Sequence, residues 1–470
     1  MAYSSLNGRK PMERASKISH TNIIASQEVK DLLAECSIPR SADTETVQAM
    51  LERVPTSGNQ NIKYVIAVDG SFREALVRDE FPSATVTFFA FGPLIFKLED
   101  LRQLDRETFI APEDLAKLKK IQRFQLALPT RNISRSGLGL QDSIRLTLHE
   151  FLARRIEGDK SLYDTLRWLI FRRWANNPDA RRTLRHCPNE AVNGCNREEI
   201  ELTADTPCRS ECTHCAGPIY LADILRLHEL VDDEQGASRS TSYLLSALET
   251  LALVHVIHAL WEMKPILLRD FLFIKDGPLA LFGQVFTLND PLRDLADFLA
   301  EHPDPADRSK VVPILNVVGL EKSGSFVEHA VHIEKSLGKA LSEAQAEGNF
   351  AGVVLPLSND YIYKYVVPGD PGGTITYGQN TYWGGKMIFK AKDGSTYVAT
   401  VPTLGGHNPA PKFEDYINLT DVLAAVSELR CSMYDNALIP VALANRLVSL
   451  SEVPSSRILE NFARGTIRYA

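Results

Sequence analysis

Five of the seven cysteines in this 470-residue chain fall within one short stretch, which constrains its folding more than any other feature. They are Cys187, Cys195, Cys208, Cys212 and Cys215. The last two form a Cys-x-x-Cys knuckle, which can present two thiolates to one tetrahedral ion. A disulfide-rich secreted domain would spread its cysteines more widely along the chain. The pattern therefore predicts a structural Zn²⁺ site in a cysteine-rich insert over residues 181–220.

Four thiolates would close the coordination shell of Zn²⁺ and leave no position for a reactive water. We predict the ligands to be Cys187, Cys195, Cys212 and Cys215, with Cys208 outside the shell. His186 or His214 is an alternative to one of these thiolates. Reduced free thiols, a redox Cys-x-x-Cys and an iron–sulfur cluster are further readings of the same cysteines, although no βαβ pattern surrounds the knuckle.

The composition is that of an ordinary globular protein, with 44% hydrophobic and 24% charged residues. These proportions exclude global disorder and low-complexity scaffolds. The net charge of −7 argues against non-specific coating of nucleic acid, but allows a local basic groove. Residues 1–14 lack the apolar core of a signal peptide, and His255 and His258 interrupt the longest apolar run, residues 251–260. We therefore expect a cytoplasmic protein without a membrane span.

Apolar runs and helical periodicity predict an α/β fold with a mixed sheet flanked by helices. The expected strands are 61–69, 84–96, 267–275, 311–319, 353–355, 386–390 and 397–401, and a turn at Gly92-Pro93 would let 94–98 continue as another antiparallel strand. The expected helices are 26–36, 44–53, 142–175, 220–229, 240–261, 419–431 and 437–450. We divide the chain into a helical lead-in, the first part of the main domain, the zinc-binding insert, and the remainder with the C-terminal helices. These units span residues 1–60, 61–180, 181–220 and 221–470.

Two of the expected apolar strands end in an Asp-Gly pair, at Asp69 and at Asp276. Hard ions such as Mg²⁺ and Mn²⁺ prefer oxygen ligands, and several carboxylates offset the charge of the ion. An Asp-Gly pair can also simply make a turn. Glu249 lies in an otherwise apolar helix, where an ionised carboxylate needs a cation or a salt bridge. It is the expected third ligand, and Glu262 at the end of that helix is the alternative.

Several short motifs, taken in order along the chain, resemble the NurA family of nucleases. They are Val-Asp-Gly-Ser at 68–71, Leu-Glu at 248–249, Lys-Asp-Gly-Pro-Leu at 275–279, Gly-Leu-Glu-Lys-Ser-Gly at 319–324 and the segment 377–386. The resemblance covers most of residues 60–450. It implies a fold similar to ribonuclease H and the metal-dependent hydrolysis of phosphodiester bonds in DNA.

The resemblance also implies roles for individual residues. Asp69, Glu249 and Asp276 would hold catalytic Mn²⁺ or Mg²⁺, and Lys322 would neutralise charge near the scissile phosphate. Tyr434 fits the Tyr of a late helix in the family. The His that follows this Tyr after eight residues is replaced here by Ala442, and Asn445 is the nearest polar residue.

Members of the family form dimers and work with HerA, a hexameric ATP-driven DNA translocase, in DNA end processing or in defence against phage. The resemblance thus implies DNA, a HerA-type ATPase and a second copy of the chain as partners. The Arg-rich segments 167–173 and 181–185 are candidate DNA contacts, although a solvated helix face explains them equally well. The alternatives are an inactive adaptor that binds DNA or a partner, and an unrelated zinc-ribbon protein in which the Asp-Gly pairs are only turns.

Overall fold

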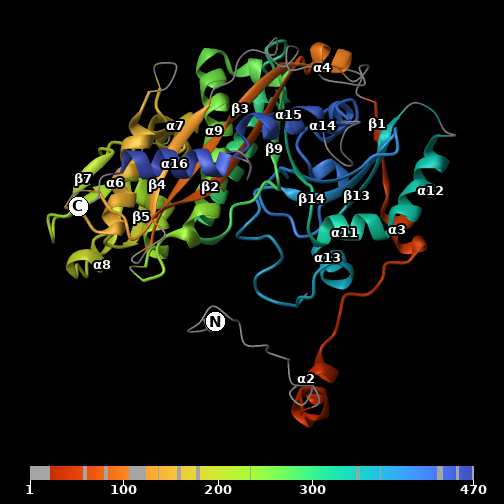
Figure 1. Cartoon of the computed structure of the whole chain (residues 1–470). Helices are drawn as coiled ribbons and strands as arrows, with labels where there is room; N and C mark the ends of the chain where they lie inside the picture. Colours follow the sequence, from red (N-terminus) through yellow and green to blue (C-terminus); the bar gives the residue numbers. More distant parts are fainter. Residues whose placement is uncertain are drawn as a thin grey trace.

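The computed structural model describes residues 22–467, apart from 57–60, 79–82, 105–122, 136, 156–159, 176–179, 233, 346–347, 349, 371, 431–437 and 451–454. The described residues form a nine-stranded mixed sheet in the order β1-β13-β14-β15-β12-β9-β2-β3-β4 (Figure 1). Its strands are β1 Glu52–Pro55, β2 Tyr64–Arg78, β3 Ala84–Lys97, β4 Phe124–Arg131, β9 Phe271–Asp276, β12 Val317–Glu321, β13 Phe350–Pro356, β14 Gly385–Ala391 and β15 Thr396–Val401. The predicted α/β fold with a mixed sheet is confirmed.

Strand directions divide the sheet into two parts. Strands β2, β3 and β4 form an antiparallel meander, and β9 and β12 continue from β2 as parallel neighbours. From β12 onward, β15, β14, β13 and β1 pair antiparallel. The parallel strands at the centre are apolar on both faces, as expected for strands covered by helices on both sides.

Helices cover both faces of the central strands. On one face, α9 (Thr241–Met263) packs on β2 and β3 and against α7 (Leu162–Ile170), and α6 (Leu140–Ala153) packs on β4 beside α7. On the other face, α14 (Leu419–Val426) and α15 (Ile439–Val448) share a core cluster with the same strands. The remaining α-helices are α2 Gln27–Glu35, α3 Thr44–Met50, α4 Leu98–Leu104, α8 Glu190–Asn193, α10 Asn289–Ala300, α11 Ser325–His332, α12 Glu334–Gln345, α13 Asn359–Tyr365 and α16 Ser455–Thr466.

The cysteine-rich insert consists of two small hairpins. Strand β5 (Arg181–His186) pairs with β6 (Glu198–Thr203), and β7 (Arg209–Glu211) pairs with β8 (Pro218–Tyr220). A further two-stranded ribbon joins β10 (His302–Pro303) to β11 (Val311–Val312). Helix α2 stands apart from the rest of the protein and has no buried residue (Figure 1). The domain boundaries given above stay predictions.

Several expected elements differ in the structure. Strand β2 does not end at Asp69 but runs on to Arg78, so that Asp69 lies within a strand. The turn expected at Gly92-Pro93 is wrong, because β3 continues through both residues. In the described part of the chain β4 pairs with β3 only as far as Phe91, so Pro93 lies outside the stretch of β3 that is paired on both sides. The expected helix 142–175 is divided into α6 and α7, and the expected helix 220–229 forms two 3₁₀ turns, 221–225 and 227–230.

Residues Ser238–Met263, which include α9, are long and apolar enough to cross a membrane by length and composition. Most of this segment is buried inside the protein, where α9 lies against the sheet. Burial on nearly all sides accounts for an apolar helix of this length.

Candidate metal centre and nucleic-acid surface

Asp69 and Asp276 lie next to each other on one face of the sheet. Strands β2 and β9 are parallel, with Val68 opposite Lys275, so the two aspartates occupy the next position on each strand. Side chains alternate along a strand. Every second residue before each aspartate packs in the core beneath α14 and α15: Val65 and Ala67 on β2, and Leu272 and Ile274 on β9. Asp69 and Asp276 therefore project toward the α14 and α15 side, on strands about 4.8 Å apart.

The surroundings of Asp69 suit a bound cation. Its side chain is buried, and burial, together with the nearby charge of Asp276, raises the pKa of Asp69 to about 7. The backbone N–H of Gly70 donates to Oδ1 over 2.7 Å, whereas the buried Oδ2 has no hydrogen-bond partner. Buried polar atoms normally have partners. An orphaned carboxylate oxygen beside a second carboxylate fits a hard divalent ion, with Asp69 and Asp276 as ligands.

Glu249 approaches the same strands from the opposite face, on α9. Its Oε2 lies 3.5 Å from Nζ of Lys275. Burial, opposed by Lys275, raises the pKa of Glu249 to about 7, and the charges of Asp69 and Asp276 contribute to the rise. In the described part of the chain, the oxygens of these three carboxylates do not all lie within 4.8 Å of one another. The structure thus brings Asp69 and Asp276 together and holds Glu249 near them, in an ion pair with Lys275.

The Val-Asp-Gly-Ser motif is explained by its two neighbours in the fold. A Cβ on Gly70 would lie 2.7 Å from Cδ1 of Leu245 and 2.9 Å from Oε1 of Glu249, so only glycine lets α9 approach β2 this closely. Ser71 accepts a hydrogen bond from the backbone N–H of Leu450 (3.1 Å) and donates to the carbonyl of Val448, at the end of α15. One tetrapeptide therefore places helices on both sides of Asp69.

Replacing Gly70 with Ala should displace α9 from the sheet. The added methyl group meets Leu245, Glu249 and Phe91 at 2.7–2.9 Å, and overpacking of this kind costs about 1–3 kcal/mol. Thermal unfolding of the variant measures the loss. A Gly394→Ala variant serves as a control that introduces backbone strain without crowding. Gly394 has φ +91, and no atom lies within 4 Å of a Cβ placed on it. Equal stability of Gly70→Ala and the wild type would contradict the close packing of α9 on β2.

Lys322 follows β12 and pairs with Asp276, with Nζ 2.7 Å from Oδ2. The Lys322 side chain is 36% exposed and its charge acts on both aspartates, so its ammonium group can meet an incoming anion. Tyr434 lies outside the described residues. On α15, Ala442 packs against the core and Asn445 is exposed. Glu262, the alternative to Glu249, pairs instead with Lys160 over 2.6 Å.

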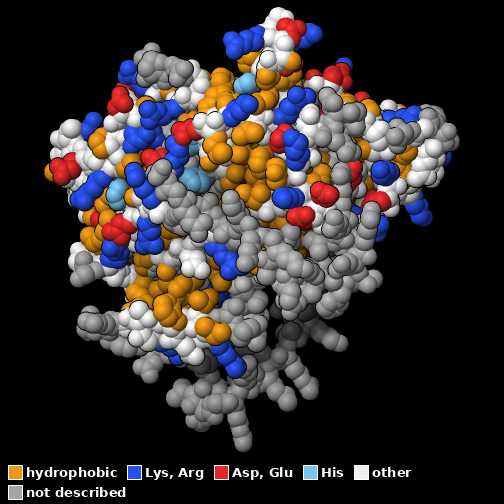
Figure 2. All heavy atoms as spheres, turned by 90° about the horizontal axis from the view of Figure 1, so that it is seen from above, with side chains coloured by type: hydrophobic (Ala, Val, Ile, Leu, Met, Phe, Trp, Pro, Cys, Tyr) orange, Lys and Arg blue, Asp and Glu red, His pale blue; other side chains and the backbone are white. Residues whose placement is uncertain are grey.

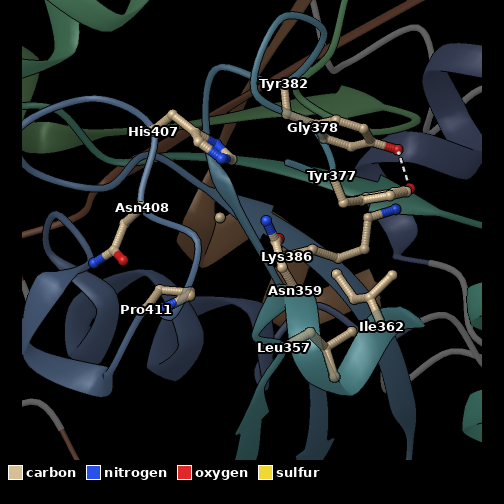
Figure 3. Close-up of a pocket in the computed structure, with 12 residues that line it drawn as sticks. Leu357, Asn359, Ile362, Tyr377, Gly378, Tyr382, Lys386, His407, Asn408 and Pro411 are labelled. Atoms are coloured by element: carbon tan, nitrogen blue, oxygen red, sulfur yellow. Dashed lines mark hydrogen bonds between the residues drawn. The ribbon is translucent and has the colours of Figure 1, made fainter. Parts of the chain in front are cut away.

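The segment 377–386 packs beside the strand end that carries Asp276. The backbone N–H of Leu281 donates to the carbonyl of Thr381, and that of Trp383 donates to the carbonyl of Leu279, both over 2.9 Å. Tyr377, Tyr382 and Lys386 of this segment line a small pocket together with Asn359 and His407 (Figure 3). The buried Lys386 ammonium pairs with Glu321 at the end of β12. The segment therefore covers the ends of the central strands.

The cysteine cluster comes together as the sequence suggested. The sulfur atoms of Cys187, Cys195, Cys212 and Cys215 all lie within 4.8 Å of one another, with two pairs at 4.0 Å. Four sulfur atoms at tetrahedral Zn–S distances of about 2.3 Å are about 3.8 Å apart, so the group fits one zinc ion. Although burial opposes it, hydrogen bonds from the backbone N–H groups of His214 and Cys215 lower the pKa of Cys212 to about 6. A thiolate is the form that binds metal.

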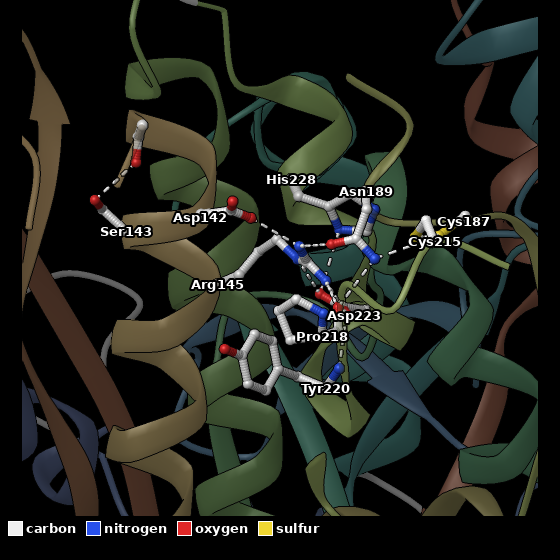
Figure 4. A network of polar contacts seen from close by, with 11 residues as sticks. Asp142, Ser143, Arg145, Cys187, Asn189, Cys215, Pro218, Tyr220, Asp223 and His228 are labelled. Atoms are coloured by element: carbon white, nitrogen blue, oxygen red, sulfur yellow. Dashed lines mark hydrogen bonds and ion pairs between the residues drawn. The ribbon is translucent and has the colours of Figure 1, made fainter. Parts of the chain in front are cut away.

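A buried polar network fastens this cluster to α6 (Figure 4). The Arg145 guanidinium donates to both oxygens of Asp223 (2.9 and 2.8 Å) and also to Asn189 Oδ1 (3.0 Å). Asn189 in turn donates to Sγ of Cys187 over 3.3 Å. A charged pair that is bidentate and fully hydrogen-bonded is stable when buried. Sequence reasoning missed these three residues, because nothing in their local pattern marks them as neighbours of the cysteines.

The Arg-rich segment 167–173 contributes to a basic groove on the outer side of α7 and α9. This groove has a volume of about 680 Å³ and is lined by Arg155, Lys160, Asp164, Arg167, Trp168, Arg173, His258, Trp261 and Glu262. Arg167 also donates to the carbonyls of Ala204 and Thr206 in the insert. On the face shown in Figure 2, basic and acidic side chains are interspersed around apolar areas. The basic groove is therefore a local feature in an acidic protein.

No protein-family model matches the chain, and no curated protein matches its sequence. Two solved structures are similar to it over nearly their whole length. The crystal structure of the NurA nuclease from Sulfolobus solfataricus has a TM-score of 0.33 and 8% sequence identity, covering 96% of this chain and 97% of that one. A second crystal structure of NurA has a TM-score of 0.30, 11% identity and the same coverage. At such scores, the likeness carries no argument about the reaction.

Proposed function

We propose that this protein is a metal-dependent deoxyribonuclease that hydrolyses phosphodiester bonds in DNA. The proposal rests on the side-by-side placement of Asp69 and Asp276, with a buried carboxylate oxygen of Asp69 that has no partner. Asp69, Asp276 and Glu249 would hold Mn²⁺ or Mg²⁺. Bound there, a divalent ion supplies Lewis-acid stabilisation of phosphate charge and lowers the pKa of a bound water. Cleavage of linear DNA by the wild type, by Asp69→Asn and by Asp276→Asn tests the proposal.

The protein's own residues provide the rest of the site. Lys322, partly exposed and paired with Asp276, faces a substrate phosphate and neutralises part of its charge. The segment 377–386 holds the ends of the central strands, and Gly70 keeps α9 close to β2. The three-strand meander that continues into two parallel strands supports a ribonuclease H-like core in this proposal.

The basic groove provides a surface for the DNA strand, since cations beside aromatic rings suit the phosphates and bases of single strands. Replacing the exposed Arg155 and Arg173 with Glu should weaken the binding of a labelled single-stranded oligonucleotide by about tenfold or more. In a plot of log affinity against log salt concentration, the slope should also become shallower, by the amount that corresponds to about two lost phosphate contacts. Fluorescence anisotropy without divalent ions measures this while cleavage is absent. The double variant Lys335→Glu with Lys339→Glu on α12 is the matched control for net charge, and equal losses in the two double variants would contradict a DNA contact in the groove.

The family resemblance extends the proposal to partners. A HerA-type hexameric ATPase would feed DNA to a homodimer of this chain in the cytoplasm, in DNA end processing or in defence against phage. Co-purification of the two proteins, and the mass of this protein alone in light scattering, test the two associations separately.

An inactive adaptor that binds DNA is the second candidate. It is favoured by α15, which offers the packed Ala442 and the exposed Asn445 where the family has a His. DNA binding that persists without any cleavage in Mn²⁺ or Mg²⁺ would support the adaptor.

A further inference from the structure

Lys275 is a buried cation directly behind the two aspartates. It precedes Asp276 on β9 and is 4% exposed. Side-chain alternation directs it toward α9, on the face opposite to Asp69 and Asp276. Its Nζ lies 3.5 Å from Oε2 of Glu249 and donates to the carbonyl of Asp276 over 3.2 Å. A lysine ammonium is rarely buried without a charge partner.

Glu249 depends on this cation in turn. Its side chain is buried in α9, and Lys275 is the charge that most opposes the rise in its pKa. Removing one member of a buried ion pair leaves the other uncompensated. In the ion-free protein, Lys275 therefore balances the negative charge of Glu249. A divalent ion would balance the same charge when Glu249 acts as a ligand.

We infer that Lys275 is an internal counter-cation, which holds Glu249 in the ion-free protein and competes with the divalent ion for it. This inference rests on the proposed function and assigns a positioning residue to the same site. While Glu249 is paired with Lys275, the carboxylate oxygens of Asp69, Asp276 and Glu249 do not all lie within 4.8 Å of one another. For all three carboxylates to bind one divalent ion, Glu249 must therefore leave Lys275 and move toward the ion. The divalent ion then binds a few ångströms from the Lys275 ammonium group, whose charge repels it.

The test is Mn²⁺ binding by titration calorimetry with the full-length protein and no DNA, which needs no catalytic activity. Lys275→Gln keeps an N–H donor for Glu249 but removes the charge, so we expect it to bind Mn²⁺ about tenfold more tightly than the wild type. Lys275→Arg keeps the charge and should stay within about threefold of the wild type. Lys390→Gln is the matched control, because Lys390, on β14, is as buried as Lys275 and pairs with Glu334 of α12.

Unchanged or weaker Mn²⁺ binding by folded Lys275→Gln would overturn the inference and leave the nuclease proposal standing if the wild type still binds Mn²⁺ and cleaves DNA. A wild type that binds no Mn²⁺ and cleaves nothing would overturn both. Should Lys275→Gln not fold, the double variant Lys275→Met with Glu249→Gln removes both buried charges. This double variant should bind Mn²⁺ more tightly than Glu249→Gln alone, because it lacks the ammonium group that repels the ion.

Discussion

Replacing Asp69 with Asn is expected to reduce Mn²⁺-dependent cleavage of linear DNA by at least about 100-fold, with the fold intact. The amide has nearly the same shape, but it lacks the charge that holds a hard cation. Asp276→Asn should have the same effect, because the two side chains occupy adjacent strands on one face. Cleavage of an end-labelled duplex and a single strand, with and without Mn²⁺, measures both variants.

The matched control is Asp270→Asn, at the other end of β9, where the carboxylate pairs with Lys63 at the surface. This variant should cleave DNA as the wild type does. Cleavage that persists in both Asp69→Asn and Asp276→Asn would contradict the metal centre. Loss in only one of them would show that the pair does not act as a unit.

Asp69→Asn should also change how stability depends on pH in the absence of divalent ions. In the folded protein the pKa of Asp69 and that of Glu249 are raised to about 7, from the ordinary values of 3.8 and 4.5. Between these limits the folded state binds more protons than the unfolded state, so raising the pH from about 5 to about 8 lowers the free energy of unfolding. The variant should lose less stability over this range. Adding Mn²⁺ at about pH 8 should restore stability to the wild type but not to Asp69→Asn, as thermal unfolding would show.

Loss of the cysteine site is the second large expected effect. Structural Zn²⁺ contributes roughly 10 kcal/mol or more to the folding of small zinc domains, so Cys212→Ser should unfold the insert over residues 181–220. The protein should contain about one Zn²⁺ per chain by elemental analysis, and none in the variant. Because Arg145 and Asn189 link Cys187 to α6, the damage should extend to the core and lower the melting temperature of the whole protein.

Cys208→Ser is the control for this experiment. Cys208 lies in the same insert but outside the four-sulfur group, and its Sγ accepts a hydrogen bond from Arg167 that a hydroxyl can replace. Zinc content and melting temperature should therefore match the wild type. Freshly purified, reduced protein without zinc would rule out the structural zinc site.

The sequence alone determined the features whose signal is local. The spacing of Cys187, Cys195, Cys212 and Cys215 identified a cluster, since the ligands of one ion lie close along the chain. Apolar runs and periodicity also located most strands and helices, including α9 and the two strands that carry Asp69 and Asp276. Element ends were less well placed, as β2 and β3 show, because strand pairing extends elements past residues that favour turns.

Only the tertiary structure decided which side chains face each other. Asp69 and Asp276 are more than two hundred residues apart, and their shared face depends on the parallel register of β2 and β9. Glu249 and Lys275 meet because Gly70 lets α9 close on the sheet, and Arg145 reaches Asn189 across separate elements. Such contacts arise from long-range pairing of strands and helices, and no pattern of neighbouring residues encodes them.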